Sequence, residues 1–173
     1  MLGKKTKKTA LVYFSLNGNT DYVAERLAEA LRDQVELDVI RLEPVKPYAD
    51  KGFRKFMKGG ADATFGAKPE LKLYNFDPRD YDTVVIGTPI WAGTVAPPLR
   101  TFMLHNRLKG KNIAIFVNSM SGNSEKCLSK FEKYLKKTNI IATMSLVEPM
   151  KAKSGEDLYT IRKFAEEIME KKQ

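Results

Sequence analysis

Short apolar runs alternate with helix-like patterns along the whole chain. Compact runs rich in β-branched and aromatic residues occupy 9–15, 82–89 and 112–119, and such runs are typical of strands covered on both faces. The run 35–43 alternates apolar and polar residues, as a strand near a sheet edge does, and 139–148 is the last strand candidate. Strands separated by helices predict an α/β sandwich with a mostly parallel sheet.

Four stretches between or after these strands place apolar residues at helical spacing, and the first begins at Thr20. The second begins at Pro97 and Pro98, which suit a first helical turn, and stops near Gly110. The last has Ser154 as a predicted N-terminal cap. The apolar stripes are Val23, Leu27 and Leu31; Leu99, Phe102 and Met103; Leu128, Phe131 and Leu135; and Leu158, Ile161, Ala165 and Ile168.

The segment 44–80 interrupts this rhythm. It holds four prolines, a Gly–Gly pair and six aromatic residues, and so many aromatic residues argue against disorder. Long loops inside a compact domain are usually functional when they are ordered. We expect a short helix around 50–58 whose Lys51, Arg54, Lys55 and Lys58 either face solvent or meet an acidic partner protein or the phosphates of a reduced nicotinamide nucleotide.

The length of 173 residues fits one domain, 1–173, with a basic tail at 1–8. The net charge of +9 is scattered, and no zinc-ligand or RNA-binding motif accompanies it, so nucleic acid is an unfavoured partner. Lys126, Lys130, Lys133 and Lys137 recur at the spacing of a solvated helix face. The alternative is that these lysines attract an anionic partner.

No apolar run approaches the roughly 20 residues of a membrane span. The N-terminal lysines precede an apolar patch that is too short for a signal peptide and lacks a cleavage site, so we expect no membrane partner and a cytoplasmic location. The single Cys127 excludes an internal disulfide and is expected in the core, and the single His105 is expected at a helix end without a catalytic role.

Three loops follow the carboxyl ends of predicted strands, and all three are rich in glycine and small polar residues. They read "SLNGNT" after 9–14, "TPIWAGT" after 82–87 and "NSMSGNS" at the end of 112–119. In parallel sheets, ligands bind beyond the carboxyl ends of the strands. The three loops therefore define one candidate site at one edge of the sheet.

The first loop joins a strand to a helix N-terminus, where free N–H groups and the helix dipole favour an anion. Ser15, Asn17, Asn19 and Thr20 add short donors, and Gly18 allows close approach or a positive φ. The loop has no lysine or arginine and matches neither a Walker A loop nor the glycine-rich dinucleotide motif. It suits a phosphate monoester held by hydrogen bonds. The alternative is a capped turn that only starts a helix.

The second loop holds the only tryptophan of the chain, Trp91. A loop position would expose its indole as a stacking face for a flat aromatic ligand, with Thr88, Gly93 and Thr94 as polar contacts. The alternative is a plug folded back over the sheet. With backbone donors from the third loop, the sequence predicts a monophosphate pocket beside a pocket for a planar ring.

These loops resemble those of the flavodoxin-like FMN-binding proteins, over essentially the whole chain. "SLNGNT" is similar to the phosphate motif of that family, and "GTPIWAGTVAPPLRTF" is similar to its second flavin loop and following helix. The resemblance implies a three-layer sandwich with a five-stranded parallel sheet in the order 2-1-3-4-5, helices on both faces, and FMN at its carboxyl edge. The implied FMN-binding residues are Ser15, Leu16, Asn17, Gly18, Asn19 and Thr20 at the phosphate; Thr88, Pro89, Ile90, Trp91, Ala92 and Gly93 along the ribityl chain and ring; and Ser119, Met120, Ser121 and Gly122 facing the ring.

Three features depart from the family pattern. Asn17 stands where a hydroxyl residue is usual, so we expect rearranged phosphate contacts. The third loop has neither an aromatic nor an acidic residue, which leaves Met120 or an aromatic residue of 44–80 for the second ring face. The carriers of the family tend to be acidic, whereas this chain is basic.

The resemblance implies an FMN protein that transfers electrons. It acts either as a carrier between proteins or as a small reductase that uses NAD(P)H and a quinone-like or other small acceptor. Because the third loop lacks a carboxylate, we expect the reduced state to be easier to reach than in acidic carriers. The alternative is a flavodoxin-fold binding or regulatory module without flavin. A phosphoacceptor receiver domain would need an aspartate where Gly87 and Thr88 stand.

Overall fold

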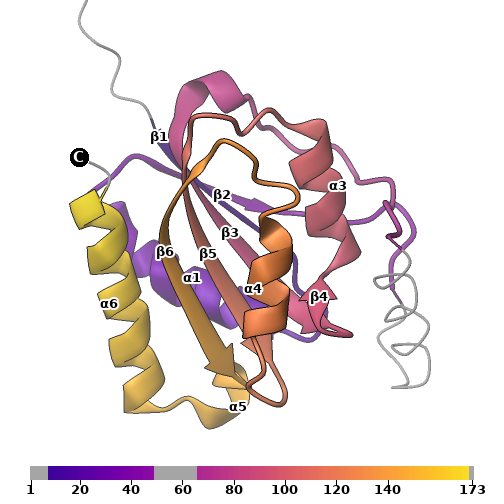
Figure 1. Ribbon diagram of the computed structural model, residues 1–173. Helices are drawn as coiled ribbons and strands as arrows, with labels where there is room; N and C mark the ends of the chain where they lie inside the picture. The colour runs from indigo at the N-terminus through magenta and orange to yellow at the C-terminus, as the bar shows by residue number, and fades with distance from the viewer. Residues whose placement is uncertain (1–7, 49–65, 172–173) are drawn as a thin grey trace, which may run out of the picture.

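The computed structural model describes residues 8–48 and 66–171. Its sheet has five parallel strands, and a short strand β4 (Thr94–Val95) pairs antiparallel with β3. With β4 set aside, the observed order is the predicted 2-1-3-4-5, so the predicted fold is confirmed (Figure 1). The parallel strands lie in the order β2 (Leu37–Arg41), β1 (Lys8–Tyr13), β3 (Tyr81–Trp91), β5 (Asn112–Ser119) and β6 (Asn139–Val147).

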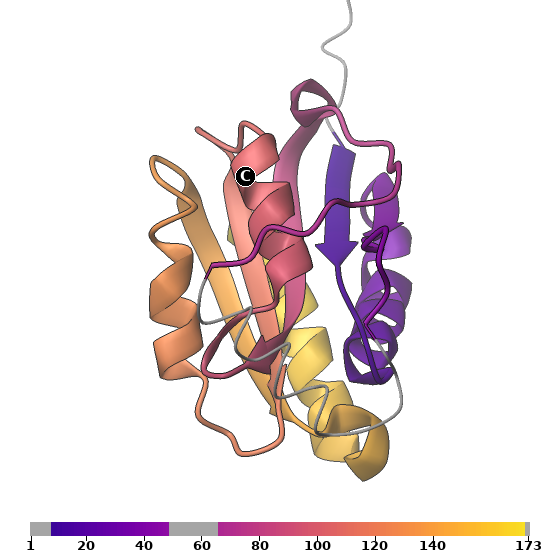
Figure 2. The same cartoon turned by 90° about the vertical axis from the view of Figure 1, so that its right-hand side faces the viewer.

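Helices cover both faces of the sheet, as Figures 1 and 2 show. One face carries α1 and α6, and the other carries α3 and α4, each pair with its own apolar cluster. The short α5 lies between β6 and α6. The bounds are α1 (Asn19–Arg32), α3 (Pro97–His105), α4 (Glu125–Phe131), α5 (Pro149–Ala152), α6 (Gly155–Lys171) and the 3-10 helix η1 (Pro78–Asp80).

The continuous apolar runs divide between the two faces residue by residue. Val12, Ile86 and Ile115 are neighbours across the sheet and pack under α3 and α4. The residues one position earlier in each strand belong to the cluster under α1 and α6. Successive side chains of a strand point to opposite faces, so a strand with both faces covered needs apolar residues at every position. This requirement explains why the predicted strands at 9–15, 82–89 and 112–119 are continuous apolar runs.

Two helices end earlier than predicted. The helix α3 ends at His105 and not near Gly110, because Asn106 leaves helical geometry and its side-chain amide donates to the Phe102 carbonyl at 2.8 Å. The helix α4 ends at Phe131, and Leu135 follows in a turn. Leu135 is still buried, so its apolar spacing reflected core packing and not helix continuation. The predicted cap of the last helix is confirmed, since the Ser154 hydroxyl accepts the Asp157 N–H.

The described ends of the 44–80 segment are anchored to the domain. Pro44 bridges to Leu71, beyond the end of β2. On α3, the Thr101 hydroxyl donates to the Pro69 carbonyl at 2.9 Å. The predicted helix around 50–58 and its four cations lie outside the described residues. Within the described part of the chain, every helix is too short or too polar to cross a bilayer.

Candidate functional site

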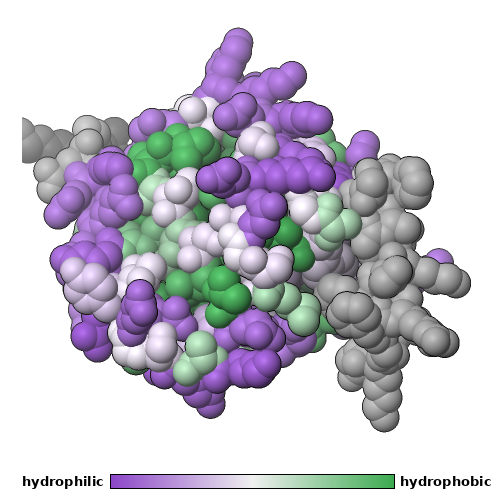
Figure 3. Space-filling view, turned by 60° about the horizontal axis from the view of Figure 1, so that its bottom comes forward, coloured by the Kyte–Doolittle hydropathy of each residue, from purple (hydrophilic) through white to green (hydrophobic). Residues whose placement is uncertain are grey.

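The three loops meet at the carboxyl edge of the sheet, at the bottom of Figure 1. Figure 3 views the molecule with this edge turned forward and shows separate apolar islands between polar residues. A narrow cleft of about 40 Å³ lies between the loops. Eight of its nine lining residues are among those predicted for the site, and the ninth is Asn118. The lining is Leu16, Asn17, Asn19, Pro89, Ile90, Trp91, Asn118, Ser119 and Met120.

The first loop satisfies its own polar groups. Gly18 caps α1 with φ at 93°, a conformation that favours glycine, and its N–H donates to the Ser15 hydroxyl at 3.2 Å. The Asn17 side-chain carbonyl accepts the backbone N–H of Asn19 at 3.5 Å and its side-chain amide at 3.4 Å. Asn17 therefore accepts hydrogen bonds within the loop, whereas its predicted role was to donate to a phosphate.

Met150 of α5 closes the first loop from a part of the chain that the sequence analysis did not include in the site. Its backbone N–H donates to the Asn19 side-chain carbonyl at 3.0 Å. A Cβ on Gly18 would lie only 2.9 Å from the Met150 sulfur, so the absence of a side chain at Gly18 permits this approach. No motif in the sequence predicted this contact, because it depends on the position in space of α5, which follows the end of β6.

The second predicted loop is a continuation of the strand β3. The strand runs through Trp91, and Ala92 and Gly93 then turn the chain into β4 with φ at 49° and 67°. Positive φ at both central residues matches the tight turns whose twist suits a β-hairpin. The prediction of a loop at 88–94 is therefore wrong, and the segment is a short hairpin at the mouth of the cleft.

Thr88 lies within the strand β3 and is fully buried. Its hydroxyl accepts the Ala96 N–H at 3.1 Å and donates to the Pro89 carbonyl at 2.9 Å. These bonds tie the end of β3 to the start of α3. The contact of Thr88 with a ligand stays a prediction, and in this arrangement its hydroxyl donates one hydrogen bond to the backbone and accepts one from it.

The Trp91 indole is only 3% exposed. It meets the rings of Phe14 and Tyr48 edge to face, with centroids at 5.5 and 4.9 Å. The expectation of an exposed stacking face is wrong, and the alternative reading of a plug over the sheet describes the packing. Trp91 nevertheless lines the cleft, so its contribution there is an apolar wall.

The third loop follows β5 and is held by a turn of its own. The Ser119 hydroxyl accepts the Gly122 N–H at 2.8 Å, and the Ser119 carbonyl accepts the Glu148 N–H at 3.0 Å. The loop carries Ser121 and Gly122 at the surface, and Met120 is 65% exposed. Met120 also lines the cleft, so it is an exposed apolar side chain at the position where a ligand could be covered.

Asn118 joins the first and third loops at the floor of the cleft. Its side-chain amide donates to the Thr20 hydroxyl at 3.0 Å, although 98 residues separate the two. Both residues are buried, so Thr20 faces Asn118 and not the surface. In the described structure the Asn118 Oδ1 atom has no hydrogen-bond partner. A buried unpaired acceptor is costly, and this one lines a cleft, where a bound donor would satisfy it.

An ion pair supports the first loop from behind. The Arg41 guanidinium lies 2.8 Å from the Asp21 carboxylate and also donates to the Ser15 carbonyl at 3.1 Å. Burial acts to raise the pKa of Asp21, but its hydrogen bond and charge interaction with Arg41 outweigh burial and lower it. Asp21 is thus ionised at neutral pH, and it fixes Arg41 in place.

Lys126 of α4 adds a positive charge beside the hairpin. Its side-chain carbons lie over Gly93, 3.3 Å from where a Cβ would be, and its ammonium is 3.8 Å from the same point. The sequence analysis read Lys126 as part of a solvated helix face. It is exposed, yet the fold also places it at the rim of the site, which helical spacing does not reveal.

The remaining candidate residues have structural positions. His105 ends α3 and is exposed, and Cys127 is fully buried, as predicted for both. Burial raises the pKa of the Cys127 thiol to about 12, so it is unreactive at neutral pH. No group of three or more potential metal ligands occurs within residues 8–48 and 66–171.

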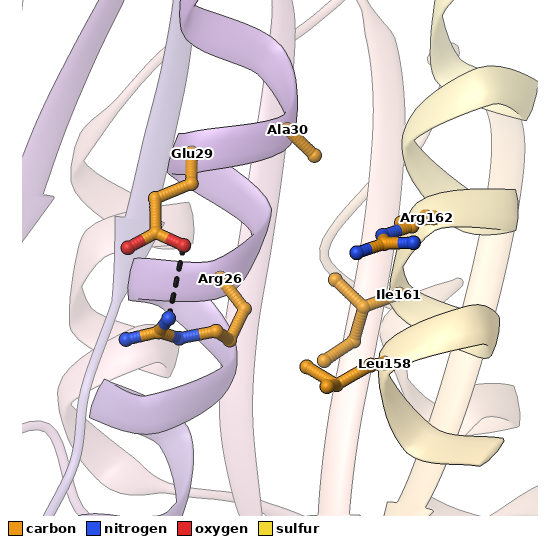
Figure 4. A pocket seen from close by; sticks show the side chains of 6 residues that line it. All are labelled: Arg26, Glu29, Ala30, Leu158, Ile161 and Arg162. Atoms are coloured by element: carbon orange, nitrogen blue, oxygen red, sulfur yellow. Dashed lines mark hydrogen bonds and ion pairs between the residues drawn. The ribbon is translucent and has the colours of Figure 1, made fainter. Parts of the chain in front are cut away.

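A second cavity, of about 310 Å³, lies between α1 and α6 and shares no residue with the cleft. Figure 4 shows the ion pair between Arg26 and Glu29 on α1, which measures 3.0 Å, and shows Leu158 and Ile161 projecting from α6 toward α1. The Arg26 guanidinium also lies over the Tyr22 ring. Arg26 is thereby occupied within α1, and this groove is a junction between two helices away from the three loops.

Comparison with known proteins relates the whole domain to one family. The sequence model of flavodoxin matches residues 8–158. The chain is 25% identical to a flavoprotein from Lactobacillus acidophilus NCFM in complex with FMN, with a TM-score of 0.68, over 86% of this chain and 97% of that one. The apo form of the flavoprotein from the same organism is 26% identical, with a TM-score of 0.61, over 81% and 92%.

Oxidised flavodoxin 2 from Bacillus cereus shares the fold at 19% identity and a TM-score of 0.63, over 95% of this chain and 99% of that one. The family match covers most of the chain and every described strand. The resemblance that the loop motifs predicted is therefore confirmed. The chain belongs to the flavodoxin family.

Proposed function

We propose that the chain binds FMN at the carboxyl edge of the sheet and serves in electron transfer. The observation that carries this proposal is Asn118, whose buried Oδ1 atom lacks a partner within the described structure and lines a cleft formed by the three loops. FMN has hydroxyl donors on its ribityl chain as well as phosphate acceptors. The lining offers the Asn118 oxygen as an acceptor for a ribityl hydroxyl and the Asn17 and Asn19 amides as donors to the phosphate. The chemistry of the lining residues therefore fits FMN.

The first loop would hold the phosphate. The N–H groups of Gly18 and Asn19 belong to the amino end of α1, where the helix dipole favours an anion. Asn17 and Asn19 would turn their amides from each other toward the phosphate, and Met150 would close the loop behind it. The loop has no cation of its own, so binding there depends on hydrogen bonds.

The ring would lie at the hairpin and the third loop. Ile90 and Trp91 form an apolar wall, and exposed Met120 can cover the opposite side. When bound, FMN supplies the redox chemistry, and the protein contributes orientation and electrostatics. Lys126 at the rim favours added negative charge there. We already expect the reduced state to be easy to reach because the third loop lacks a carboxylate, and Lys126 would act in the same direction.

The test is reconstitution of the flavin-free protein with FMN and, in parallel, with riboflavin, followed by titration of the Trp91 fluorescence. Because Trp91 is the only tryptophan and lines the cleft, we expect saturable quenching. We expect FMN to bind at least tenfold more tightly than riboflavin, since a tenfold ratio needs only about 1.4 kcal/mol from the phosphate contacts. Equal affinities would contradict the assigned phosphate loop, and the absence of binding would contradict the function.

The electron donor and acceptor need a separate assay. Oxidation of NAD(P)H by the FMN-loaded protein with a quinone acceptor would assign a reductase, whereas reduction only through a partner reductase would assign a carrier. One observation favours a rival function: the cleft of about 40 Å³ is much smaller than a flavin. A protein that stays colourless with FMN would be the flavodoxin-fold binding module.

A further inference from the structure

A separate cavity of about 550 Å³ lies beside the end of β2. It shares only Leu16 with the candidate flavin cleft. Its volume falls within the range of about 300–1,000 Å³ typical of small-molecule sites. Neither the FMN proposal nor the comparisons assigns it a ligand.

The floor of this cavity is apolar and formed by buried residues. Leu42 is fully buried and Phe14 is 3% exposed. Leu42 extends the pairing of β1 and β2 through its N–H, which donates to the Tyr13 carbonyl at 2.8 Å. Tyr48 forms a further wall, with its ring edge to face against Phe14 at 5.9 Å. Such a floor accepts a flat aromatic body.

The rim of the cavity carries a row of three charged side chains. Glu43 lies between two cations, at 3.4 Å from the Arg41 guanidinium and 2.7 Å from the Lys72 ammonium. All three side chains are between 41% and 59% exposed. Exposed ion pairs contribute little to stability, so a ligand can displace Glu43 from this row at small cost. Arg41 would stay in place, because Asp21 holds it from outside the cavity.

We propose that this cavity binds a planar aromatic carboxylate. The ring lies against Phe14 and Tyr48, and the carboxylate replaces that of Glu43 between Arg41 and Lys72. The two cations of the rim are balanced by Glu43 and by Asp21, which pairs with Arg41 from outside the cavity. The preference for an anionic over a cationic ligand therefore comes from the net charge of +9 of the whole chain. The site does not depend on flavin, because Arg41, Glu43 and Lys72 do not line the flavin cleft.

The test uses 2-naphthoate as the probe and the neutral 2-naphthylmethanol as its comparison, with binding measured by isothermal titration calorimetry. The full chain is titrated both without flavin and after loading with FMN. We expect saturable binding of 2-naphthoate in both states, with at least fivefold weaker binding of the alcohol. Equal affinity for the two probes would overturn the role of the rim. Displacement of the probe by FMN would overturn the separate site.

Three variants sharpen the test. Lys72→Gln should weaken 2-naphthoate binding about five- to tenfold, whereas Glu43→Gln should tighten it several-fold because it removes the competing carboxylate. Lys46→Gln is the matched control: Lys46 is exposed and close in sequence but does not line the cavity, so its loss should change affinity less than twofold. A fold defect cannot produce the gain expected for Glu43→Gln. Equal losses in the two lysine variants, or no gain in Glu43→Gln, would overturn the proposal.

Discussion

Replacing Asn118 by leucine tests whether its unpaired Oδ1 atom is kept for a ligand. Leucine has the same number of side-chain heavy atoms as asparagine and branches at the same carbon, and it removes both polar atoms at once. The first of these, the amide nitrogen, donates to Thr20 at 3.0 Å. The second, Oδ1, is buried without a partner in the described structure. The two losses act on stability with opposite signs.

The magnitudes follow from these two atoms. Loss of the hydrogen bond to Thr20 leaves the buried Thr20 hydroxyl without this partner and costs roughly 1–3 kcal/mol, and removal of a buried unpaired acceptor returns roughly 1–3 kcal/mol. The free energy of unfolding of the flavin-free protein should therefore stay within about 2 kcal/mol of its original value. The FMN affinity should fall about five- to tenfold, because a ligand hydroxyl loses its acceptor.

The assay combines urea unfolding of the flavin-free protein with FMN titration. Asn112→Leu is the matched control for binding, since Asn112 lies at the opposite end of β5 and its replacement should leave FMN affinity unchanged. Thr20→Val is the control for stability: it strands the Asn118 amide and should lower the free energy of unfolding by about 1–3 kcal/mol. A drop of more than about 2 kcal/mol in Asn118→Leu with unchanged FMN affinity would refute the reasoning.

Three further predictions concern the core, the charge at the rim and pH. Gly87→Ala would place a Cβ between 2.1 and 2.6 Å from atoms of the Phe116 ring, so urea unfolding should show a loss of about 3 kcal/mol or more, and Phe116→Leu should restore part of it; an unchanged midpoint would contradict the packing. Lys126→Gln should lower the midpoint potential of the FMN-loaded protein in a redox titration by on the order of 20 mV. The shift is small because solvent screens the charge. An increase in the potential would contradict the position of Lys126 beside the flavin. Burial and nearby carboxylates raise the pKa of Tyr13 and Tyr81 from 10.0 to about 12, so their contribution to stability is present below pH 10 and is lost as pH rises from 10 to 12. Phenylalanine at both positions should flatten this loss in urea unfolding, and an unaltered slope would contradict it.

The parallel sheet was predictable from the sequence because parallel strands need helices between them and apolar residues on both faces, whereas its strand order was predicted from the family resemblance. The runs around Val12, Ile86 and Ile115 have this property. The helix ends were less predictable. Leu135 keeps an apolar spacing after α4 has ended, because burial selects an apolar residue in a turn as readily as in a helix.

The candidate site was predictable where it depends on the topology and not where it depends on packing. The carboxyl ends of β1, β3 and β5 had to meet, and with them eight of the nine cleft residues. The burial of Trp91 depends on Phe14 and Tyr48, whose positions come from other parts of the chain. The contact of Met150 with the first loop likewise arises only in the folded chain.

The state of the first loop explains how a loop without cations can serve an anion. Its internal hydrogen bonds are long, at 3.2 Å from Gly18 to Ser15 and 3.5 Å from Asn19 to Asn17, and bonds of this length are weak. They nevertheless engage the N–H groups of Gly18 and Asn19, two of those that the amino end of α1 leaves free, so the loop avoids part of the cost of unpaired donors. A phosphate would exchange these neutral bonds for charge-assisted ones, which are shorter and roughly twice as strong. The gain in binding free energy is the difference between the bonds that the phosphate makes and the bonds that the loop loses. Asn17 stands where a hydroxyl residue is usual and accepts both hydrogen bonds from Asn19, so it determines how much hydrogen-bond energy the loop loses when a phosphate binds.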